Sequence, residues 1–544
     1  MRKIPHISFA VLFIVLFAIS VNAQQKTPPV IEWQRSIGGS NRDEPNSIQQ
    51  TRDGGYIIAG SSWSFDGDVF EHHGDSNNPD FYNPDYWIVK LNDIGDIQWQ
   101  RTLGGLNWDE AQSNQQTYDG GYIVAGTSSS NNIDVTGNHG SYDYWVVKLD
   151  STGATQWQKA MGGSNYDYSY SIQQTRDSGY IVAGWSQSTN GDVKGHHGSS
   201  NSADYWIVKL DVRGDLKWQK SLGGSSWDAA YSIQQTQDDG YIVAGSSNSK
   251  DNNVTENHGA INCWIIKLDD SGVIQWQRSL GGNGNDVALC ALQTQDGGYA
   301  IVGTTESNDG DVTMNYGFSD YWIVKLDNVG LVQWQISLGG GYYDEASFFQ
   351  QTQNGGYVIV GKSYSTNGQI TGNLGNSDYW IVKLNDTGSI QWQKSLGGSS
   401  WDNATSIQQT KDQGFIVAGR SSSNDGDVAE HHGSTDTSDF WIVKLSPEGT
   451  TSAEAEPATT STITITPNSA TSSATITLES DEAGACEVQI ISVTGATLKE
   501  YSTHIGAGKQ EIVLRDLESL PTGMYEVLVK RGGYGTLRTK LIIQ

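Results

Sequence analysis

The stretch Asp143-Tyr144-Trp145-Val146-Val147-Lys148-Leu149, with Trp157-Gln158 shortly after it, is one copy of a pattern that fills most of this 544-residue chain. The Trp-Gln pair recurs at intervals of 58 to 66 residues, and a second Trp lies in each copy of a string that resembles residues 143–149. Repeats of this length are typical of propellers, solenoids and arrays. The pairs begin at Trp33, Trp99, Trp157, Trp218, Trp276, Trp334 and Trp392, and the second Trp is Trp87, Trp145, Trp206, Trp264, Trp322, Trp380 and Trp441.

Each repeat predicts four strands and no helix. In the second repeat the alternating segments are residues 113–117, 122–127, 144–149 and 155–161. Residues 118–121 (YDGG) and 150–153 (DSTG) are typical of the tight turns that join neighbouring antiparallel strands. Helix-containing arrays of the leucine-rich, ankyrin or tetratricopeptide kind are therefore excluded.

The two ends of the repeat region decide between a closed ring and an open rod. The region starts with a fourth strand, residues 31–37, and stops after a third strand, residues 440–445. An open rod would leave an incomplete unit with unpaired edges at each end. Pairing of these two segments would complete a seventh unit, so the sequence predicts an all-β, seven-bladed β-propeller over residues 24–445. The repeats also resemble those of secreted bacterial β-propeller repeat proteins.

The chain is acidic and rich in aromatic residues. Its 33 Lys and Arg stand against 61 Asp and Glu, a formal net charge of −28, which disfavours nucleic acid as a partner because the phosphate backbone is also negative. Nineteen Trp, 25 Tyr and 11 Phe supply buriable surface for a folded chain. Three Cys cannot build a disulfide framework.

The first 23 residues have the pattern of a signal peptide. Arg2 and Lys3 precede an apolar run over residues 9–19, and Val21-Asn22-Ala23 offers small residues for cleavage. No later stretch is apolar enough for a membrane-spanning helix. We therefore expect an exported mature chain without a transmembrane segment.

The composition changes after Leu445. Residues 446–461 are small, polar and contain Pro, as in a linker, and residues 462–544 show short alternating strands separated by Gly, as in a small immunoglobulin-like β-sandwich. This part contains Pro467-Asn468, Val493-Thr494-Gly495, the run 520–525 (LPTGMY) and the run 540–543 (KLII). In this order they resemble the C-terminal sorting domains of the type IX secretion system of Bacteroidetes.

The resemblance implies a route out of the cell. An outer-membrane translocon would recognise the domain, and the protein would cross the periplasm and then be released or attached to the outer cell surface. The sequence departs from the family pattern at Ser469, where a second Pro is usual, and at Ser492-Val493, where Tyr-Asp is common. An ordinary accessory domain of the same fold is the alternative. The residues that carry the resemblance are Pro467, Asn468, Gly495, Pro521, Gly523, Tyr525 and Lys540.

An Asp follows the Gly-Gly pair that ends each Trp-Gln strand, and the residue before this Asp is aromatic in five of seven repeats. In a propeller this connection shares a face with the long loop between the second and third strands. An aromatic ring beside a carboxylate suits a sugar, because the ring stacks on the apolar face and the carboxylate accepts hydrogen bonds from hydroxyls. The alternative is that each Asp binds backbone groups of its own turn.

The first long loop differs most from the others, because it carries an insertion at residues 75–84 and has Trp63 nearby. Sites on symmetric scaffolds are expected where one repeat deviates, which adds Trp63 to the candidates. The candidate glycan-binding residues are Trp63, Trp108, Asp109, Tyr166, Asp167, Trp227, Asp228, Tyr343, Asp344, Trp401 and Asp402.

The long loops also repeat an Asp-Gly-Asp or Asn-Gly-Asp pattern that offers oxygen ligands for Ca²⁺. Three repeats break the pattern and the terminal Glu of an EF-hand is missing, so turn formation is the alternative. The loop His residues lack zinc-ligand spacing, and no other cofactor is expected. The candidate Ca²⁺ ligands are Asp66, Asp68, Asp192, Asp309, Asp311, Asp425 and Asp427.

The sequence contains no nucleophile elbow, P-loop or zinc-protease motif. It therefore favours a non-enzymatic exported propeller that binds a glycan or a surface, or that acts as a scaffold. One alternative is a polysaccharide-degrading, endoglucanase-like glycoside hydrolase, and another is a purely structural surface protein.

Overall fold

The computed structural model describes residues 26–74, 83–449, 464–467, 469–480, 484–491, 497–506, 508–531 and 534–543. The expected signal peptide, most of the expected linker and most of the insertion in the first long loop lie outside these residues. The chain divides into two compact units, Met1–Gly449 and Thr450–Gln544.

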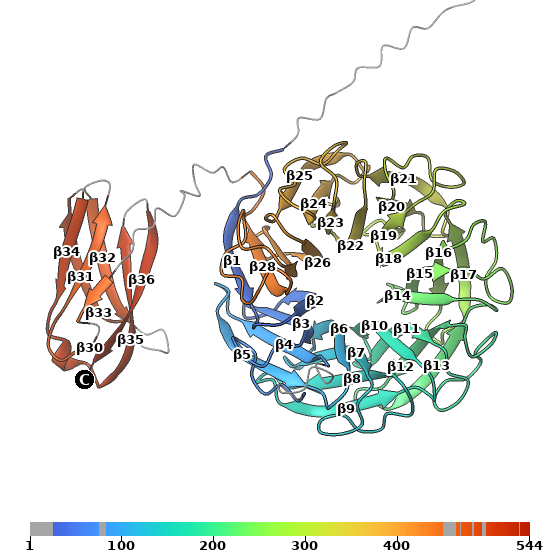
Figure 1. Ribbon diagram of the computed structural model, residues 1–544, viewed down its shortest axis with the longest axis horizontal. Helices are drawn as coiled ribbons and strands as arrows, with labels where there is room; N and C mark the ends of the chain where they lie inside the picture. Colours follow the sequence, from blue (N-terminus) through green and yellow to red (C-terminus); the bar gives the residue numbers. More distant parts are fainter. Residues whose placement is uncertain are drawn as a thin grey trace, which may run out of the picture. The chain divides into compact units, whose positions relative to one another are not determined.

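The described part of the first unit forms a ring of seven four-stranded antiparallel sheets, the blades of a β-propeller (Figure 1). Blade 1 contains β2 (Asp43–Gln50), β3 (Tyr56–Ser62), β4 (Asp85–Leu91) and β5 (Ile97–Leu103). Blade 2 contains β6 (Asp109–Gln116), β7 (Tyr122–Ser128), β8 (Asp143–Leu149) and β9 (Thr155–Met161). Blade 3 contains β10 (Asp167–Gln174), β11 (Tyr180–Ser186), β12 (Asp204–Leu210) and β13 (Leu216–Leu222). Blade 4 contains β14 (Asp228–Gln235), β15 (Tyr241–Ser247), β16 (Asn262–Leu268) and β17 (Ile274–Leu280).

The remaining blades repeat this order, with the first strand of each nearest the centre of the ring (Figure 1). Blade 5 contains β18 (Asp286–Gln293), β19 (Tyr299–Thr305), β20 (Asp320–Leu326) and β21 (Val332–Leu338). Blade 6 contains β22 (Asp344–Gln351), β23 (Tyr357–Ser363), β24 (Asp378–Leu384) and β25 (Ile390–Leu396). Blade 7 contains β26 (Asp402–Gln409), β27 (Phe415–Ser421), β28 (Asp439–Leu445) and β1 (Ile31–Ile37).

The N-terminal strand closes the ring. β1 pairs antiparallel with β28, and the register places Ile37 opposite Phe440 and Ile31 opposite Leu445. The indole N–H of Trp441 donates to Gln34 Oε1 at 2.7 Å, as Trp145 donates to Gln158 inside blade 2 at 2.8 Å. The predicted seven-bladed propeller and its closing strand are therefore confirmed.

Aromatic pairs fill the space between neighbouring blades. Trp145 of β8 is buried, and its ring lies 4.5 Å from the ring of Tyr86 in the preceding blade. The Tyr86 hydroxyl donates to the Trp145 carbonyl oxygen at 2.9 Å, so the contact is both apolar and hydrogen-bonded. Four more junctions use the same Tyr–Trp pair, and Phe440 contacts Trp87 where blade 7 meets blade 1.

Gln side chains at the end of each innermost strand also link the blades. Gln115 Oε1 accepts a hydrogen bond from the Gln174 N–H at 2.6 Å, and Gln174 Oε1 accepts one from the Tyr118 N–H at 2.8 Å. The first of these bonds recurs at six of the seven junctions. At the seventh junction Leu292 takes the place of the first Gln and has no amide to offer.

The innermost strands begin earlier than the sequence predicted. We expected the first strand of the second repeat to start at residue 113, whereas β6 starts at Asp109 and has a bulge between Ala111 and Ser113. A bulge interrupts the period-two alternation of side chains, which hid the first half of the strand from a pattern-based prediction. Asp109 is therefore part of a strand and not of the connecting loop.

The second unit consists of two small sheets around one hydrophobic core. The three-stranded sheet contains β29 (Thr464–Thr466), β31 (Ala474–Ser480) and β34 (Gly508–Leu514). The five-stranded sheet contains β30 (Ser469–Ala470), β32 (Gly484–Ile491), β33 (Thr497–Ile505), β35 (Gly523–Arg531) and β36 (Tyr534–Ile543), and a short 3₁₀ helix, η2, spans Leu517–Ser519.

Several of the predicted sorting residues occupy defined places in this unit. Gly523 opens β35, and the buried Tyr525 donates its hydroxyl to the Pro521 carbonyl oxygen at 2.5 Å. Lys540 lies in β36 in register with Glu526, and Pro467 follows β29. Asn468 and Gly495 lie outside the described residues. Within the described residues, no helix has the length and apolar character needed to span a bilayer.

Candidate functional site

The Asp that opens each innermost strand is buried and organises a turn. Asp109 Oδ2 accepts hydrogen bonds from the Gly105 N–H at 2.7 Å and from the Ser130 hydroxyl at 2.8 Å. One carboxylate thus ties the blade-to-blade connection to the start of the long loop. The same two bonds occur at Asp43, Asp109, Asp167, Asp228, Asp286, Asp344 and Asp402.

A second buried Asp lies beside the first at six of the seven junctions. Asp85, the first residue of β4, neighbours Asp109, and a Cβ atom at Gly104 would collide with both carboxylates. This explains why the first position of the Gly-Gly pair admits no side chain. Burial raises the pKa of Asp109 to about 7, and the charge of Asp85 acts in the same direction.

These contacts show that each Asp binds backbone and side-chain groups of its own turn, which the sequence analysis gave as the alternative to glycan binding. Burial likewise raises the pKa of Asp43 and of Asp167 to about 7. Their oxygens face the polypeptide and not the loop surface, since all seven side chains are fully buried. A ligand on the loop-bearing face would therefore contact the aromatic residue that precedes each Asp in the sequence. It would not contact the Asp carboxylates themselves.

Four of the aromatic candidates are exposed on the loop-bearing face. Tyr166, Trp227, Tyr343 and Trp401 have exposed fractions of 36% to 46%. Their backbones form isolated bridges to the residue that precedes the third strand of the preceding blade. The bridges hold each ring at the rim of the junction between two blades.

Five aromatic side chains form a continuous band across blades 2 to 4, here called the aromatic band: Tyr142, Tyr166, Tyr168, Trp185 and Trp227. Tyr142 stacks on Tyr166 and Tyr168, with ring centroids 5.5 and 5.1 Å apart. Tyr168 stacks on Trp185 at 4.6 Å, and Trp185 contacts Trp227 at 4.9 Å. The band therefore joins two predicted residues to three that the sequence analysis did not select.

The three additional residues do not recur from repeat to repeat, so the repeat pattern gave no signal for them. Tyr168 occupies the second position of the innermost strand, where other blades carry Glu44, Val287 or Asn403. Trp185 lies opposite Tyr168 in the register of the next strand. Variation between repeats at one strand position was the signal that would have found them.

Two smaller aromatic pairs lie on other blades. Trp63 packs edge-on against Trp108 with centroids 5.5 Å apart, and the Arg42 guanidinium lies 5.3 Å from the Trp63 ring. The Trp108 indole N–H donates to Glu110 at 3.2 Å. Phe318 stacks on Tyr343 at 5.1 Å. The structure thus brings Trp63 and Trp108 together.

The Asp-Gly-Asp loops fold back onto the Gly-Gly pair. Asp66 Oδ1 accepts from the Ser40 N–H at 2.7 Å, and Asp68 Oδ2 accepts from the Gly38 N–H at 3.2 Å. Gly67 between them has a φ of 66°, a conformation that favours glycine. The same turn contacts engage Asp192, Asp309, Asp311, Asp425 and Asp427.

No three His, Cys, Asp or Glu side chains gather as a metal site in the part of the chain that the structure describes. Several loop His residues instead bind the second buried Asp. His73 approaches Asp85 Oδ2 with its ring Nδ1 at 2.9 Å and donates its backbone N–H to the same oxygen at 2.7 Å. Ca²⁺ binding by the loop carboxylates stays a prediction.

Residues 464–544 match the family model described as the secretion system C-terminal sorting domain. The second unit is a type IX secretion sorting domain. The protein is therefore secreted or attached to the outer surface, and its tail implies an interaction with the secretion machinery. No curated protein matches the chain.

Several solved structures are similar to the chain at low sequence identity. Sqt1 from Chaetomium thermophilum is 10% identical with a TM-score of 0.38, over 77% of this chain and 100% of that one. A glycoside hydrolase family 43 arabinoxylan arabinofuranohydrolase from Bacillus subtilis, in complex with cellotetraose, is 11% identical with a TM-score of 0.29, over 94% and 96% of the two chains. A puromycin hydrolase is 10% identical with a TM-score of 0.40, over 73% of this chain and 53% of that one.

Proposed function

We propose that the propeller binds an extracellular glycan through the aromatic band and leaves it chemically unchanged. The aromatic band carries this proposal: five ring systems in mutual contact cross three blades. Tyr166 and Trp227 are exposed, Tyr142 and Tyr168 are half-buried, and the buried Trp185 supports them from beneath. Sugar rings present apolar C–H faces, and flat aromatic surfaces bind such faces with a large buried area and little loss of side-chain entropy.

The extent and charge of the surface narrow the ligand class. A band that crosses three blades offers contacts to several consecutive sugar units and not to a single one. The net charge of −28 opposes sulfated or other strongly anionic glycans, because long-range repulsion slows and weakens their association. A neutral polysaccharide or oligosaccharide is therefore the expected ligand.

The experiment measures binding to neutral polysaccharides, namely cellulose, xylan, mannan, β-1,3-glucan and starch, by affinity electrophoresis and calorimetry. We expect one of them to bind the wild-type chain in the presence of EDTA. Tyr166→Ala and Trp227→Ala should each weaken this binding about tenfold, as expected for aromatic anchors of an interface.

The matched control for these variants is Tyr118→Ala. Tyr118 is 58% exposed but lies in the turn between β6 and β7, at the opposite end of the strands. It should change neither binding nor the melting temperature. Failure of every polysaccharide to bind, or an equal loss in the control, would refute the proposed function and would favour a purely structural surface protein.

Hydrolysis of the bound glycan is a second candidate, and one observation favours it. Burial raises the pKa of the Glu110 carboxyl, and the charge of Glu44 on the neighbouring blade acts in the same direction, whereas Glu44 is bound by Arg42 and Arg420. Two carboxyl groups in unlike environments are what a glycoside hydrolase uses as acid and base. The same incubations, assayed for new reducing ends, distinguish the candidates, and Glu110→Gln should abolish any release that occurs.

A further inference from the structure

The centre of the ring is lined by different side chains on its two sides. The fourth residue of the innermost strand is Tyr170 in blade 3 and Tyr231 in blade 4, and the two rings lie 5.1 Å apart. Both pack against the cluster formed by Trp185, Ala203 and Ala229. On this side, large aromatic side chains fill the wall beneath the aromatic band.

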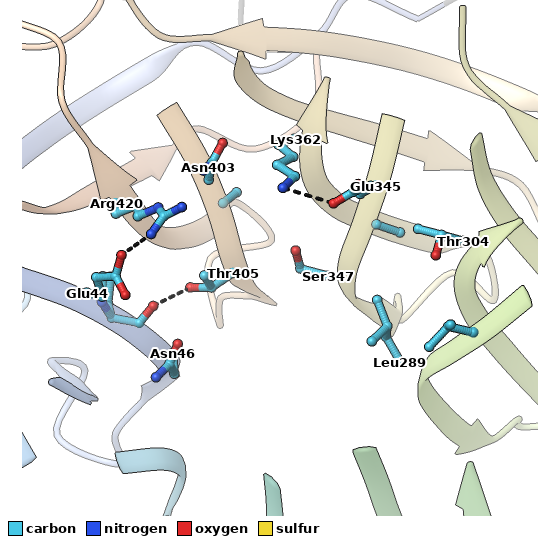
Figure 2. Close-up of a pocket in the computed structure, with 14 residues that line it drawn as sticks. Glu44, Asn46, Leu289, Thr304, Glu345, Ser347, Lys362, Asn403, Thr405 and Arg420 are labelled. Carbon is cyan, nitrogen blue, oxygen red and sulfur yellow. Dashed lines mark hydrogen bonds and ion pairs between the residues drawn. The ribbon is translucent and has the colours of Figure 1, made fainter. Parts of the chain in front are cut away.

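The equivalent positions on the other side carry smaller side chains. They are Leu289, Ser347, Thr405 and Asn46 in blades 5, 6, 7 and 1. Where the tyrosines are absent, a cavity of about 440 Å³ opens between these blades (Figure 2). A volume of this order accommodates a small ligand. Tyr168 and Trp185 face each other across two strands of blade 3. The equivalent cross-strand pairs in blades 6 and 7, Glu345 with Lys362 and Asn403 with Arg420, line the cavity. The cavity therefore lies at the same level of the ring as the aromatic band.

Two carboxylates with fixed positions project into the cavity. Glu345 Oε2 forms an ion pair with Lys362 at 2.9 Å, and Glu44 Oε1 is bound by Arg420 (Figure 2). Arg42 binds the same oxygen of Glu44. No described residue donates to the other oxygen of either carboxylate. Each Glu therefore keeps one acceptor for a ligand, while a neighbouring cation fixes its orientation.

The charges of the cavity are balanced by the protein itself. Glu44 and Glu345 are paired with Arg420 and Lys362, so an ionic ligand would have to compete with an existing ion pair. A ligand with hydroxyl groups needs no such displacement, since each hydroxyl donates to a carboxylate oxygen that is already oriented. The aliphatic side chains of Val287 and Leu289 add an apolar wall for C–H groups.

We infer that this cavity binds one uncharged sugar unit, the terminal unit of the glycan whose following units lie on the aromatic band. Carboxylate acceptors, an apolar wall and balanced charge together select a neutral polyol ring over an anion or a cation. The inference rests on the proposed glycan-binding function. It adds that the protein recognises the end of the glycan chain. It makes the aromatic band the surface for internal units and the cavity the site that recognises the end.

The repeats themselves supply the variants that test this inference. Ser347→Tyr introduces in blade 6 the side chain that blades 3 and 4 carry at the equivalent position, and it should fill the cavity without disturbing the fold. Gln112→Tyr makes the same change in blade 2, whose residues do not line the cavity, and is the matched control. Glu345→Gln removes one charged acceptor and keeps the size of the side chain.

The measurement is saturation-transfer NMR with the free monosaccharides glucose, xylose, mannose, galactose and N-acetylglucosamine at millimolar concentration, beside the polysaccharide assay. One monosaccharide should bind the wild-type chain, Tyr166→Ala and Gln112→Tyr with similar affinity. Ser347→Tyr should abolish this signal, and Glu345→Gln should weaken it about tenfold or more, which corresponds to the loss of a charged hydrogen bond.

The outcomes separate the cavity from the aromatic band. Binding of a polysaccharide without binding of any monosaccharide would overturn the assignment of the cavity and leave the proposed function standing. The same would follow if Ser347→Tyr and Gln112→Tyr behaved alike, or if a charged sugar such as glucuronate or glucosamine displaced the neutral one. If neither polysaccharide nor monosaccharide bound, both proposals would fall.

Discussion

Asp320 and Asp378 open the third strands of blades 5 and 6 and are buried beside Asp344 and Asp402. Burial raises the pKa of both to about 7, and the neighbouring carboxylate adds to the effect. In the unfolded chain an Asp titrates near 4. Between these two pH values the folded state keeps a proton that the unfolded state has released. The free energy of unfolding should therefore fall as the pH rises from about 4 to about 7.

We expect the melting temperature to be higher at pH 5 than at pH 8 by a few degrees or more. The double variant Asp320→Asn/Asp378→Asn should reduce this difference and raise the melting temperature at pH 8. Asn262 is the natural precedent: its Oδ1 accepts the Gly259 N–H at 2.9 Å, as Asp320 accepts the Tyr316 N–H at 2.6 Å.

Thermal unfolding across this pH range checks the prediction. Asp386→Asn, at an exposed turn position, is the control and should leave the pH profile unchanged. A double variant that follows the wild-type profile would show that these carboxyl groups do not keep their protons in the folded state.

Among the elements, the turn between the first two strands of a blade carries an Asp that binds the buried Lys of the third strand. Lys148 Nζ lies 2.9 Å from Asp119, and five other blades repeat this pair. Blade 6 has Asn354 in place of the Asp. There Lys383 donates to the Leu384 carbonyl oxygen at 2.9 Å, and burial lowers its pKa to about 8.

Asn354→Asp should stabilise the protein at neutral pH by about 0.5–1 kcal/mol, the range for a partly exposed ion pair. With its lowered pKa, Lys383 weakens folding at pH values below about 8, because the unfolded chain holds the proton more tightly. A carboxylate beside it reduces this penalty, and the gain should disappear toward pH 11, where the Lys is neutral in both states.

Chemical denaturation at pH 7 and at pH 11 measures the effect. Asp296→Asn, which copies blade 6 into blade 5, should destabilise by a similar amount. The turn itself tolerates either residue, since Thr352 donates to Asn354 at 2.6 Å as Thr294 donates to Asp296 at 2.5 Å. Equal stability of both variants and the wild type would mean that the ion pairs contribute nothing measurable.

The contrast between elements also shows what the sequence could and could not predict. Strands such as β8 have an unbroken run of buried residues and a recurring Trp, so their position and pairing followed from the repeat alone. The innermost strands were placed too late because of their bulge, and Asp109 was assigned to a loop. The aromatic band and the cavity depend on Tyr168, Tyr170 and Ser347, which differ from repeat to repeat. The sequence alone does not single out such positions. Their equivalence between blades becomes visible only from the strand register in the structure.

For the molecule as a whole, the pairing of β1 with β28 closes the propeller ring. Its bonds join residues far apart in the chain, such as Gln34 and Trp441, which are 407 positions apart. Without β1, the edge of β28 is unpaired and open to other chains. Stability of the ring is therefore shared among all seven blades and lost together.

Deletion of residues 26–37 should yield a chain that oligomerises and unfolds at a lower temperature, whereas a chain that starts at Lys26 should be a stable monomer. Size-exclusion chromatography with light scattering, followed by thermal unfolding, compares the two. A monomeric deletion variant with an unchanged melting temperature would show that six complete blades close without the N-terminal strand.

The same pairing orders events during biosynthesis. The first propeller strand to be made must wait for the last, and the sorting domain lies after that last strand in the chain. A chain that ends before β28 therefore lacks both the strand that pairs with β1 and the sorting domain. Because the sorting domain lies after the last propeller strand, only a polypeptide that contains every blade also carries the signal for export to the surface.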